Sequence, residues 1–523
     1  MKKILIIVMT FLVIASCTKL EDLNKDTKRP TKVPGVTLFS NAQKNLADQI
    51  ASTNVNNNVF KLWAQYWTET TYTDEANYDI VNRTIADNAW RTWYRDVLMD
   101  FREASLTIKS TDYATEAETK AAANQLVIID IMEVYVYERM VTLWGDIPYT
   151  EALDVENILP KYDDALTIYK DLLTRLNNDI DNMDLTATSF GSADIIYGGD
   201  VPSWIKFANS LKVKMGVVLS TADATLATNA IQTGMAGAFS SNADNANITF
   251  LSSPPNTNPL YVDLTLSGRQ DFIGTTIITE EMNPKFDPRM TAYFSGLSFV
   301  YDVNDEGTKI DTELEGEGNM LLIYSDALVE VELPVVILAE DSLHTFTYNL
   351  GGVYGASNPY TGFSHVGDVM ASDPTFPCTI LSYVEVEFYL AEAAARNLIN
   401  EDAETHYNNG ITASFDFWGV AGAADYIAKP EVAYTTAAGT WEQKIGTQAW
   451  IAFYNNGYLG WTEYRRLGFP TLPMPPGPAF AITEIPTRFT YPVFEQTLNA
   501  DSYNAAAAAI GGDLLTTKLF FEK

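Results

Sequence analysis

The sequence is poor in cysteine, histidine and basic residues, and each shortage removes a class of function. Its 523 residues contain 2 cysteines, Cys17 and Cys378, so a disulfide framework cannot hold the fold. The 3 histidines form no HExxH zinc motif. Lysine and arginine number 34 against 67 acidic residues, and the formal net charge of -33 disfavours binding to nucleic acid or anionic lipid.

Long hydrophobic runs and nucleotide-binding loops are also missing. After the N-terminal run, the most apolar segment is 126–141, which is interrupted by Asp130, Glu133, Glu138 and Arg139. No phosphate loop or GxGxxG is present, and GFSHVG at 362–367 lacks the spacing of a nucleophile elbow. We therefore expect no enzyme and no cofactor. A glycosidase with paired carboxylates stays open as a rival, because acidic residues are frequent throughout the chain.

The N-terminus has the pattern of an export signal. Lys2 and Lys3 precede an apolar run over 4–15, which is too short to span a bilayer and ends in Ile-Ala-Ser-Cys. This looks like a bacterial lipobox, so we predict a signal peptide over 1–16, lipidation of Cys17 and a polar tether over 17–37. Three acyl chains would hold the protein on its membrane. The alternative is an ordinary signal peptide with an incidental cysteine.

The rest of the chain, 38–523, is predicted to form one mainly α-helical body. Helical periodicity covers 38–241 and 381–466, with Thr115 and Glu118 as a capping box and Trp63, Trp90 and Trp93 on core-facing stripes. Between these regions, 242–380 is an irregular insertion with short strands, and 467–523 is again irregular. Successive helices with short links predict stacked helix pairs, although no clean 34-residue repeat is visible.

Seven strings in order give the chain a family resemblance. They are WGDIPYTEAL (144–153), WIKFANSLKVKM (204–215), DPRMTAYF (287–294), ILSYVEVEFYLAEAAARN (380–397), YNNGITASFDFWGV (407–420), WTEYRRLGFP (461–470) and IPTRFTYPVFEQTLN (485–499). With these strings in this order after a lipobox, the chain resembles the SusD/RagB family of nutrient-binding lipoproteins, and most closely its SusD-like branch. The stretch 302–348 departs from the pattern, because it looks longer and more strand-like.

The resemblance implies a fold, a location and a role. The fold is a scaffold of about four tetratricopeptide-like helix pairs with a loop-rich face. The location is the outer membrane, lipid-anchored and facing the cell exterior. The role is to capture an oligosaccharide, or in some members a peptide, and to cover a SusC-like TonB-dependent transporter that takes the ligand up.

Three loops dense in aromatic residues and amides are the predicted ligand site. Flat rings suit the apolar faces of sugars, and amides or carboxylates suit their hydroxyls. The loops are 67–82, between the first two helices, 256–272 and 354–363. The chosen residues are Tyr72, Asn77, Tyr78, Tyr261, Arg269, Gln270, Asp271, Asn358 and Tyr360. The alternative for each tyrosine is packing beneath its own loop.

The remaining motifs suggest a possible calcium loop and structural ion pairs. Asp302, Asn304 and Glu306, with Glu313 at position 12, partly match a calcium-binding loop, although Lys309 stands at an apolar position and a solvated acidic loop is the alternative. Glu392 precedes Arg396 by four residues, which favours an ion pair within a helix. Arg465 and Arg466 are predicted to tie the C-terminal segment to the helices.

Overall fold

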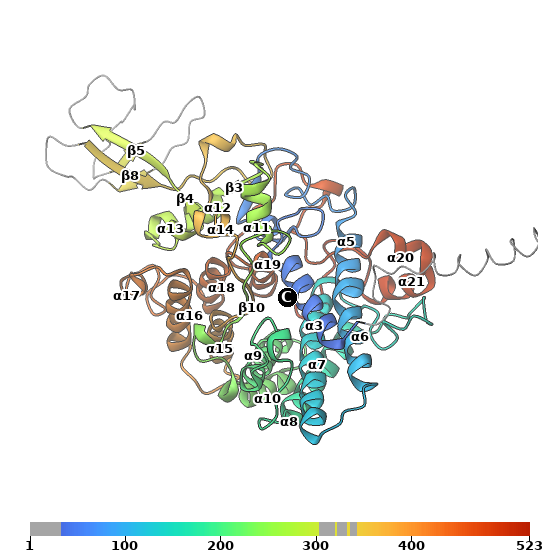
Figure 1. Cartoon of the computed structure of the whole chain (residues 1–523). Helices are drawn as coiled ribbons and strands as arrows, with labels where there is room; N and C mark the ends of the chain where they lie inside the picture. The colour runs from blue at the N-terminus through green and yellow to red at the C-terminus, as the bar shows by residue number, and fades with distance from the viewer. Residues whose placement is uncertain (1–32, 303–318, 322–331, 335–342, 523) are drawn as a thin grey trace, which may run out of the picture.

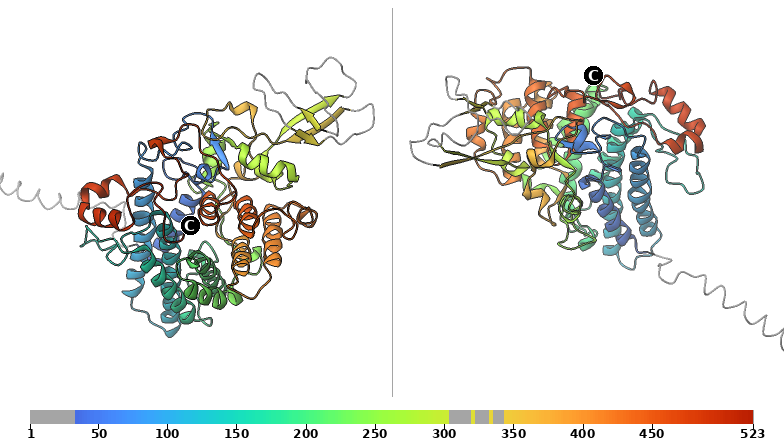
Figure 2. Two further views of the ribbon diagram at one scale, coloured as in Figure 1. Left: turned by 180° about the vertical axis from the view of Figure 1, so that it is seen from behind. Right: turned by 90° about the horizontal axis from the view of Figure 1, so that it is seen from above.

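The computed structural model describes residues 33–302, 319–321, 332–334 and 343–522. Its N-terminal half is built from long helices that lie side by side (Figures 1 and 2). The bounds are α3 Gly35–Ala51, α4 Phe60–Trp63, α5 Ile85–Arg91, the π-helical stretch η2 Thr92–Leu98, α6 Met99–Lys109, α7 Glu116–Trp144, α8 Ala165–Asn182, α9 Val201–Leu219 and α10 Ala224–Gly234.

The insertion leaves and rejoins the helical body through one pair of strands. Strand β2 (Ala246–Ile248) pairs antiparallel with β10 (Cys378–Leu381). Between them lie α11 Pro259–Tyr261, η6 Val262–Leu266, β3 Phe272–Gly274, α12 Thr276–Met282, η7 Asn283–Lys285, α13 Met290–Tyr293, β4 Phe294–Ser295, β5 Leu297–Asp302, β6 Asn319–Leu321, β7 Glu332–Pro334, β8 Leu343–Tyr348, η8 Tyr360–Gly362, β9 His365–Val366 and α14 Asp368–Ala371. The β5–β8 ladder projects away from the helices (Figure 1).

The second helical region completes the body. Its bounds are α15 Tyr383–Ala395, α16 Ala403–Trp418, α17 Ala423–Ile427, α18 Trp441–Ala452 and α19 Gly457–Leu467, followed by η9 Ala479–Ala481, α20 Val493–Leu498 and α21 Ala500–Ala509. Helices pack in pairs, namely α3 with α6, α7 with α8, α9 with α10, α15 with α16, and α18 with α19. The mainly helical fold is confirmed, with one pair more than expected among the described residues.

Sequence signals explain where the helices begin. Thr115 caps α7, because its hydroxyl accepts from the Glu118 N–H at 3.2 Å while the Glu118 carboxylate accepts from the Thr115 N–H at 3.0 Å. Ser382 and Glu385 make the same reciprocal box at α15. The core-facing tryptophans Trp63, Trp90 and Trp93 are all buried, as predicted from their helical spacing, and Trp204 is buried as well.

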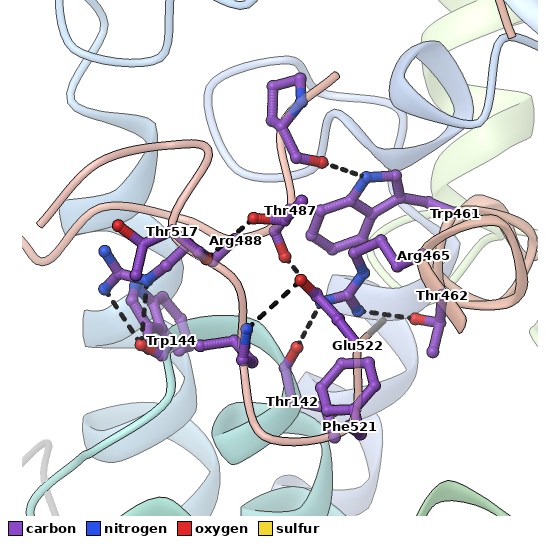
Figure 3. A network of polar contacts seen from close by, with 12 residues as sticks. Thr142, Trp144, Trp461, Thr462, Arg465, Thr487, Arg488, Thr517, Phe521 and Glu522 are labelled. Carbon is purple, nitrogen blue, oxygen red and sulfur yellow. Dashed lines mark hydrogen bonds and ion pairs between the residues drawn. The ribbon is translucent and has the colours of Figure 1, made fainter. Parts of the chain in front are cut away.

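The C-terminal segment is bound to the scaffold by Arg465, as expected. Figure 3 shows its guanidinium between Thr142 at the end of α7 and Glu522. It donates to the carbonyl oxygens of Thr142 and Thr487 at 2.7 and 2.8 Å and lies 3.2 Å from the Glu522 carboxylate. Arg466 differs from the prediction, because it pairs with Glu392 and Glu463 within the helices instead.

Two regions predicted to be irregular contain helices. In the insertion, the Thr275 hydroxyl accepts from the Ile278 N–H at the start of α12, and Ile278 and Met282 bury one face of that helix. In the C-terminal segment, an alanine run over 505–509 belongs to α21, in keeping with the high helix propensity of alanine. The body also begins earlier than predicted, since α3 starts at Gly35 rather than at residue 38.

Candidate functional site: a loop cluster and its neighbouring cleft

The three loops predicted from distant parts of the sequence meet in space around Thr70. Its N–H donates to the carbonyl oxygen of Asp271 at 2.9 Å, and its hydroxyl donates to that of Gln270 at 2.7 Å. Its own carbonyl oxygen accepts from the Asn358 N–H at 3.2 Å and the Ser357 hydroxyl at 3.0 Å. Pairing of β1 (Trp67–Glu69) with β3 fixes the first two loops together. We call residues 67–82, 256–272 and 354–363 the loop cluster.

Asn77 joins the loop cluster internally and to the proline-rich segment 469–481. Its Nδ2 donates to the carbonyl oxygens of Gly355 and Thr73 at 2.7 and 2.8 Å. Its Oδ1 accepts from the Gly477 N–H at 3.2 Å, and its carbonyl oxygen accepts from the Ala479 N–H at 2.7 Å. Because these contacts use the side-chain amide, Asn77 holds the loops in place and does not offer that amide to a ligand.

Tyr78 also supports the loop from beneath. Its side chain has no exposed surface, and its ring meets Trp63 edge to face at 5.9 Å between centroids. Gln65 donates to its hydroxyl at 3.3 Å, and burial raises the pKa of Tyr78 to about 12. The stacking role predicted for Tyr78 therefore does not fit, since neither ring face reaches the solvent.

Asn358 has the same supporting function in the third loop. Its Nδ2 donates to the carbonyl oxygens of Val353 and Ala356 at 3.0 and 2.8 Å, while its Oδ1 accepts from the Val353 N–H at 3.0 Å. The residue is buried. Asn358 therefore holds its own loop together, and its side-chain amide already has hydrogen-bond partners.

Tyr72 is the predicted aromatic residue that the structure exposes most to solvent. Its side chain is 76% exposed at the surface of the loop cluster, and its backbone φ of 55° lies in the left-handed region. Tyr360 is half-buried, and its ring stacks on His365 at 3.7 Å between centroids. Burial raises the pKa of Tyr360. Of these two rings, Tyr72 has the more accessible surface.

The second loop contributes a charged pair at its edge. The Arg269 guanidinium lies 2.5 Å from the Asp271 carboxylate, and Arg269 is exposed. Gln270 is exposed as well, whereas Tyr261 is half-buried at the end of α11. Of the residues predicted in this loop, Arg269 and Gln270 are therefore the ones that are open to solvent and accessible to a ligand.

A buried carboxyl pair underlies the loop cluster. Glu69 accepts from the Ala76 N–H at 3.1 Å, and the Glu75 carboxylate lies 2.5 Å from Arg83. Burial, together with the neighbouring Glu75, raises the pKa of Glu69 to about 9. Both glutamates are buried, so this pair braces the loop and is closed to a glycan.

A cleft of about 840 Å³ adjoins the loop cluster and shares Tyr354 with it. Helices α12 and α18 form two walls, and the proline-rich segment forms a third. Apolar surface comes from Ile277, Val353, Phe469, Met474 and several prolines, and polar groups include Thr276, Gln443 and Thr447. Its size and mixed lining are those of a small-molecule site.

The predicted calcium loop lies almost entirely outside the described residues. Asn304, Glu306 and Glu313 are not described, and Asp302 is the last residue of β5, paired with Leu343. Over the part of the chain that the structure does describe, no three histidine, cysteine, aspartate or glutamate side chains gather closely enough to hold a metal. Calcium binding stays a prediction.

The membrane-related predictions also concern residues beyond those described. Cys17 and the signal segment fall within 1–32. Among the described helices, none combines the length and the apolar character that a membrane crossing requires.

The comparisons with known proteins identify the family. The profile of the SusD-like family, described as "Starch-binding associating with outer membrane", matches residues 27–492. The chain belongs to the SusD-like family. Its members are glycan-binding proteins associated with the outer membrane, and this chain is accordingly a binding protein and not an enzyme. A search of curated proteins finds no match.

Solved structures of SusD-like proteins share the whole architecture. A chitin-binding protein is 22% identical with a TM-score of 0.73, and the match covers 93% of this chain and 99% of that one. A chitin-binding SusD homologue from Flavobacterium johnsoniae is 21% identical with a TM-score of 0.68, covering 93% and 97%. A SusD homologue from Bacteroides thetaiotaomicron is 19% identical with a TM-score of 0.71, covering 94% and 99%. At these identities the likeness establishes the fold.

Sequence reasoning missed the cleft and two exposed aromatic residues, Phe286 and Phe480, that are near its lining residues in the sequence. Phe480, in the proline-rich segment, is 60% exposed with a left-handed φ of 57°. The segment was predicted only as irregular. The available signal was a phenylalanine within a segment dense in proline. Such a segment has little core in which to bury the ring, so an exposed ring could have been expected.

Proposed function

We propose that this SusD-like protein binds a nutrient oligosaccharide on the loop cluster and hands it to a SusC-like TonB-dependent transporter. The observation that carries this proposal is that three separately predicted loops meet around Thr70, in a cluster that exposes Tyr72 and adjoins the cleft. The loops are braced by buried amides and carboxyls, so the surface they present is preorganised for a ligand.

The proposed location is the outside of the outer membrane, with the lipid on Cys17 as anchor. The family is associated with that membrane. The polar stretch before α3 supplies a tether, and the strongly acidic body would stay in solution above an anionic surface. Such a tethered body has the freedom to cover and uncover a transporter mouth. Co-purification with a transporter from solubilised outer membranes tests this part, and a protein that always elutes alone would count against it.

The ligand class is a neutral glycan. The family description names starch, and two structurally similar proteins are named for chitin, so maltohexaose and N-acetylchitohexaose are the first probes. A peptide array on the same soluble protein covers the peptide-binding alternative.

The test of the site is Tyr72→Ala. A lost aromatic stack is worth on the order of 1 kcal/mol, so the variant should bind whichever hexasaccharide the parent binds roughly fivefold more weakly. Because the ring is exposed, the melting temperature should not move. Unchanged binding in a folded Tyr72→Ala protein would remove the loop cluster as the site.

A further inference from the structure

Exposed aromatic side chains in this protein share an unusual backbone conformation. Among the residues whose side chains the structure describes, 33–296 and 349–522, the exposed aromatics are Tyr72, Phe286 and Phe480. Their φ angles are 55°, 44° and 57°, so all three lie in the left-handed region. That conformation costs about 1–2 kcal/mol for a residue other than glycine. At Phe286 the fold explains the conformation, because this residue ends η7 and its N–H donates to the Asn283 carbonyl oxygen at 2.9 Å. At Tyr72 and Phe480 an exposed ring gains little from burial to offset the cost, so the conformation there points to a role outside folding.

Two of the three rings lie close in the chain to residues that line the cleft. Phe286 follows Lys285, and Phe480 lies four residues after Pro476, and both Lys285 and Pro476 line the cleft. Tyr72 is connected to the same wall through Asn77, which bonds to Gly477. Phe286 is therefore adjacent in sequence to the α12 side of the cleft, and Phe480 belongs to the segment that forms the proline-rich wall.

The charges in the cleft favour an uncharged or amine-bearing ligand. Lys285 is paired with Glu281, and Lys444 donates to the Tyr434 carbonyl oxygen at 2.7 Å. Glu280 and Glu431 are exposed, and neither makes a hydrogen bond or ion pair with another residue in the part of the chain that the structure describes. The two lysines of the cleft thus already have partners, while the carboxylates of Glu280 and Glu431 stay available to accept hydrogen bonds from sugar hydroxyls or from an ammonium group. A uronic or sulfated sugar would meet repulsion instead.

We infer that this cleft is a second subsite for the same glycan, reached across Phe480 from Tyr72, and that it selects long chains of neutral or amino sugars over anionic ones. This inference rests on the proposed function, because the first sugar units are held on the loop cluster. A short chain occupies the loop cluster alone, and a longer chain extends over Phe480 into the cleft.

The experiment compares chain lengths on matched variants. The titrations use the parent protein and three variants, namely Tyr72→Ala, Phe480→Ala and Gln443→Trp, of which the last fills the cleft. Each protein is titrated with maltose, maltohexaose, N-acetylchitobiose and N-acetylchitohexaose. Gln443 is exposed on α18, so the larger ring blocks the cleft without entering the core. Leu498→Ala is the control, since Leu498 is 69% exposed on α20, on the opposite side of the body from α12 and α18 (Figure 1).

Phe480→Ala and Gln443→Trp should each weaken hexasaccharide binding about fivefold or more and leave disaccharide binding unchanged, while Tyr72→Ala weakens both. Hexasaccharide binding equal to the parent in both cleft variants, with Tyr72→Ala still impaired, overturns the second subsite and leaves the proposed function standing. Parent-like binding by Tyr72→Ala removes the loop-cluster site, and failure of the parent to bind either hexasaccharide overturns both.

A separate comparison tests whether the protein prefers neutral over anionic sugars. The parent should bind the neutral hexasaccharide at least tenfold more tightly than hexagalacturonate, and the double variant Glu280→Gln, Glu431→Gln should narrow that ratio. Equal affinity of the parent for the neutral and anionic hexamers contradicts the assigned ligand class. Hydrogen exchange gives a readout besides affinity, because the hexasaccharide but not the disaccharide should protect amides over 431–440.

Discussion

The side chain of Asn77 donates to the carbonyl oxygen of Gly355 across 278 positions of sequence, at 2.7 Å. This amide joins the loop 67–82 to the loop 354–363 of the insertion. The surface proposed to hold a glycan therefore depends on contacts between segments that are far apart in the sequence.

Replacing Asn77 with alanine should loosen that surface. The change leaves the buried Gly355 carbonyl without its partner, and an unsatisfied buried group costs about 1–3 kcal/mol. The Gly477 N–H also loses its partner, but Gly477 is exposed, so water can replace it. We expect a lower melting temperature, faster proteolysis within 67–82 and weaker glycan binding. Asn82→Ala is the matched control, because Asn82 is exposed in the same loop. Equal melting temperatures in the two variants would argue against the joining role.

Replacing Arg465 with methionine should destabilise the whole protein. The variant loses bonds to two carbonyl oxygens and leaves the buried Glu522 carboxylate without its cation. Breaking a buried pair in this way costs about 3–5 kcal/mol, measured as the free energy of unfolding in urea. Arg95→Ala, which removes an exposed pair with Asp96, should change that free energy by less than about 1 kcal/mol. If Arg465→Met lowered the free energy of unfolding by a similarly small amount, the attachment of the C-terminal segment would contribute little to stability.

Stability should fall as the pH rises from 5 to 8. Burial raises the pKa of Glu69 to about 9 and that of Glu385 and Glu522 to about 7. Between the unfolded value near 4.5 and these folded values, the folded state holds more protons, so the free energy of unfolding decreases with pH. Burial lowers the pKa of Lys61 to about 8, which would make stability rise with pH. This opposite effect sets in only above the pH interval from 5 to 8.

Urea unfolding at pH 5, 6.5 and 8 measures this slope. Glu69→Gln keeps a neutral side chain at that position and removes its proton uptake, so its slope should be shallower than that of the parent. A parent whose stability rises over the same interval would contradict the protonated state of these carboxyls in the folded protein.

Replacing Cys17 with alanine should release the protein from membranes. The lipid on Cys17 is the proposed anchor, and no described helix offers another. Fractionation of cells expressing the parent and the variant checks this, with Cys378→Ala as the control because that buried thiol lies in β10. Membrane retention of the Cys17→Ala protein would point to a different attachment.

Much of the fold was predictable because its signals are local. The Thr115–Glu118 box and the tryptophan stripes depend on residues three or four apart, and the structure confirms them. The Glu392–Arg396 pair, at 2.7 Å, follows from the same spacing. The pair of Arg466 with Glu392 did not follow, because the two residues lie on different helices, 74 positions apart in the sequence.

The site was predictable as a set of loops but not residue by residue. Tyr72 and Tyr78 share one loop and one chemistry, yet one is 76% exposed and the other has no exposed surface. The difference depends on Trp63 and Tyr354, which cover Tyr78 from two other segments. Amides such as Asn77 and Asn358 look equally suited to a sugar or to a backbone carbonyl, and here the backbone uses both.

The pairing of β2 with β10 has a consequence for how such a protein can diversify. Both ends of the insertion are fixed side by side at Ile248 and Cys378. Closing a segment between two fixed ends costs an entropy that grows only with the logarithm of its length. Loops within 249–377 can therefore change in length at a small entropic cost, provided that the segments packed on the helical body keep contacts such as the β1–β3 pair and the bond from the Tyr293 hydroxyl to the Ile451 carbonyl oxygen. The ligand specificity of such a protein can thus change through its loops while α10 and α15 keep their places.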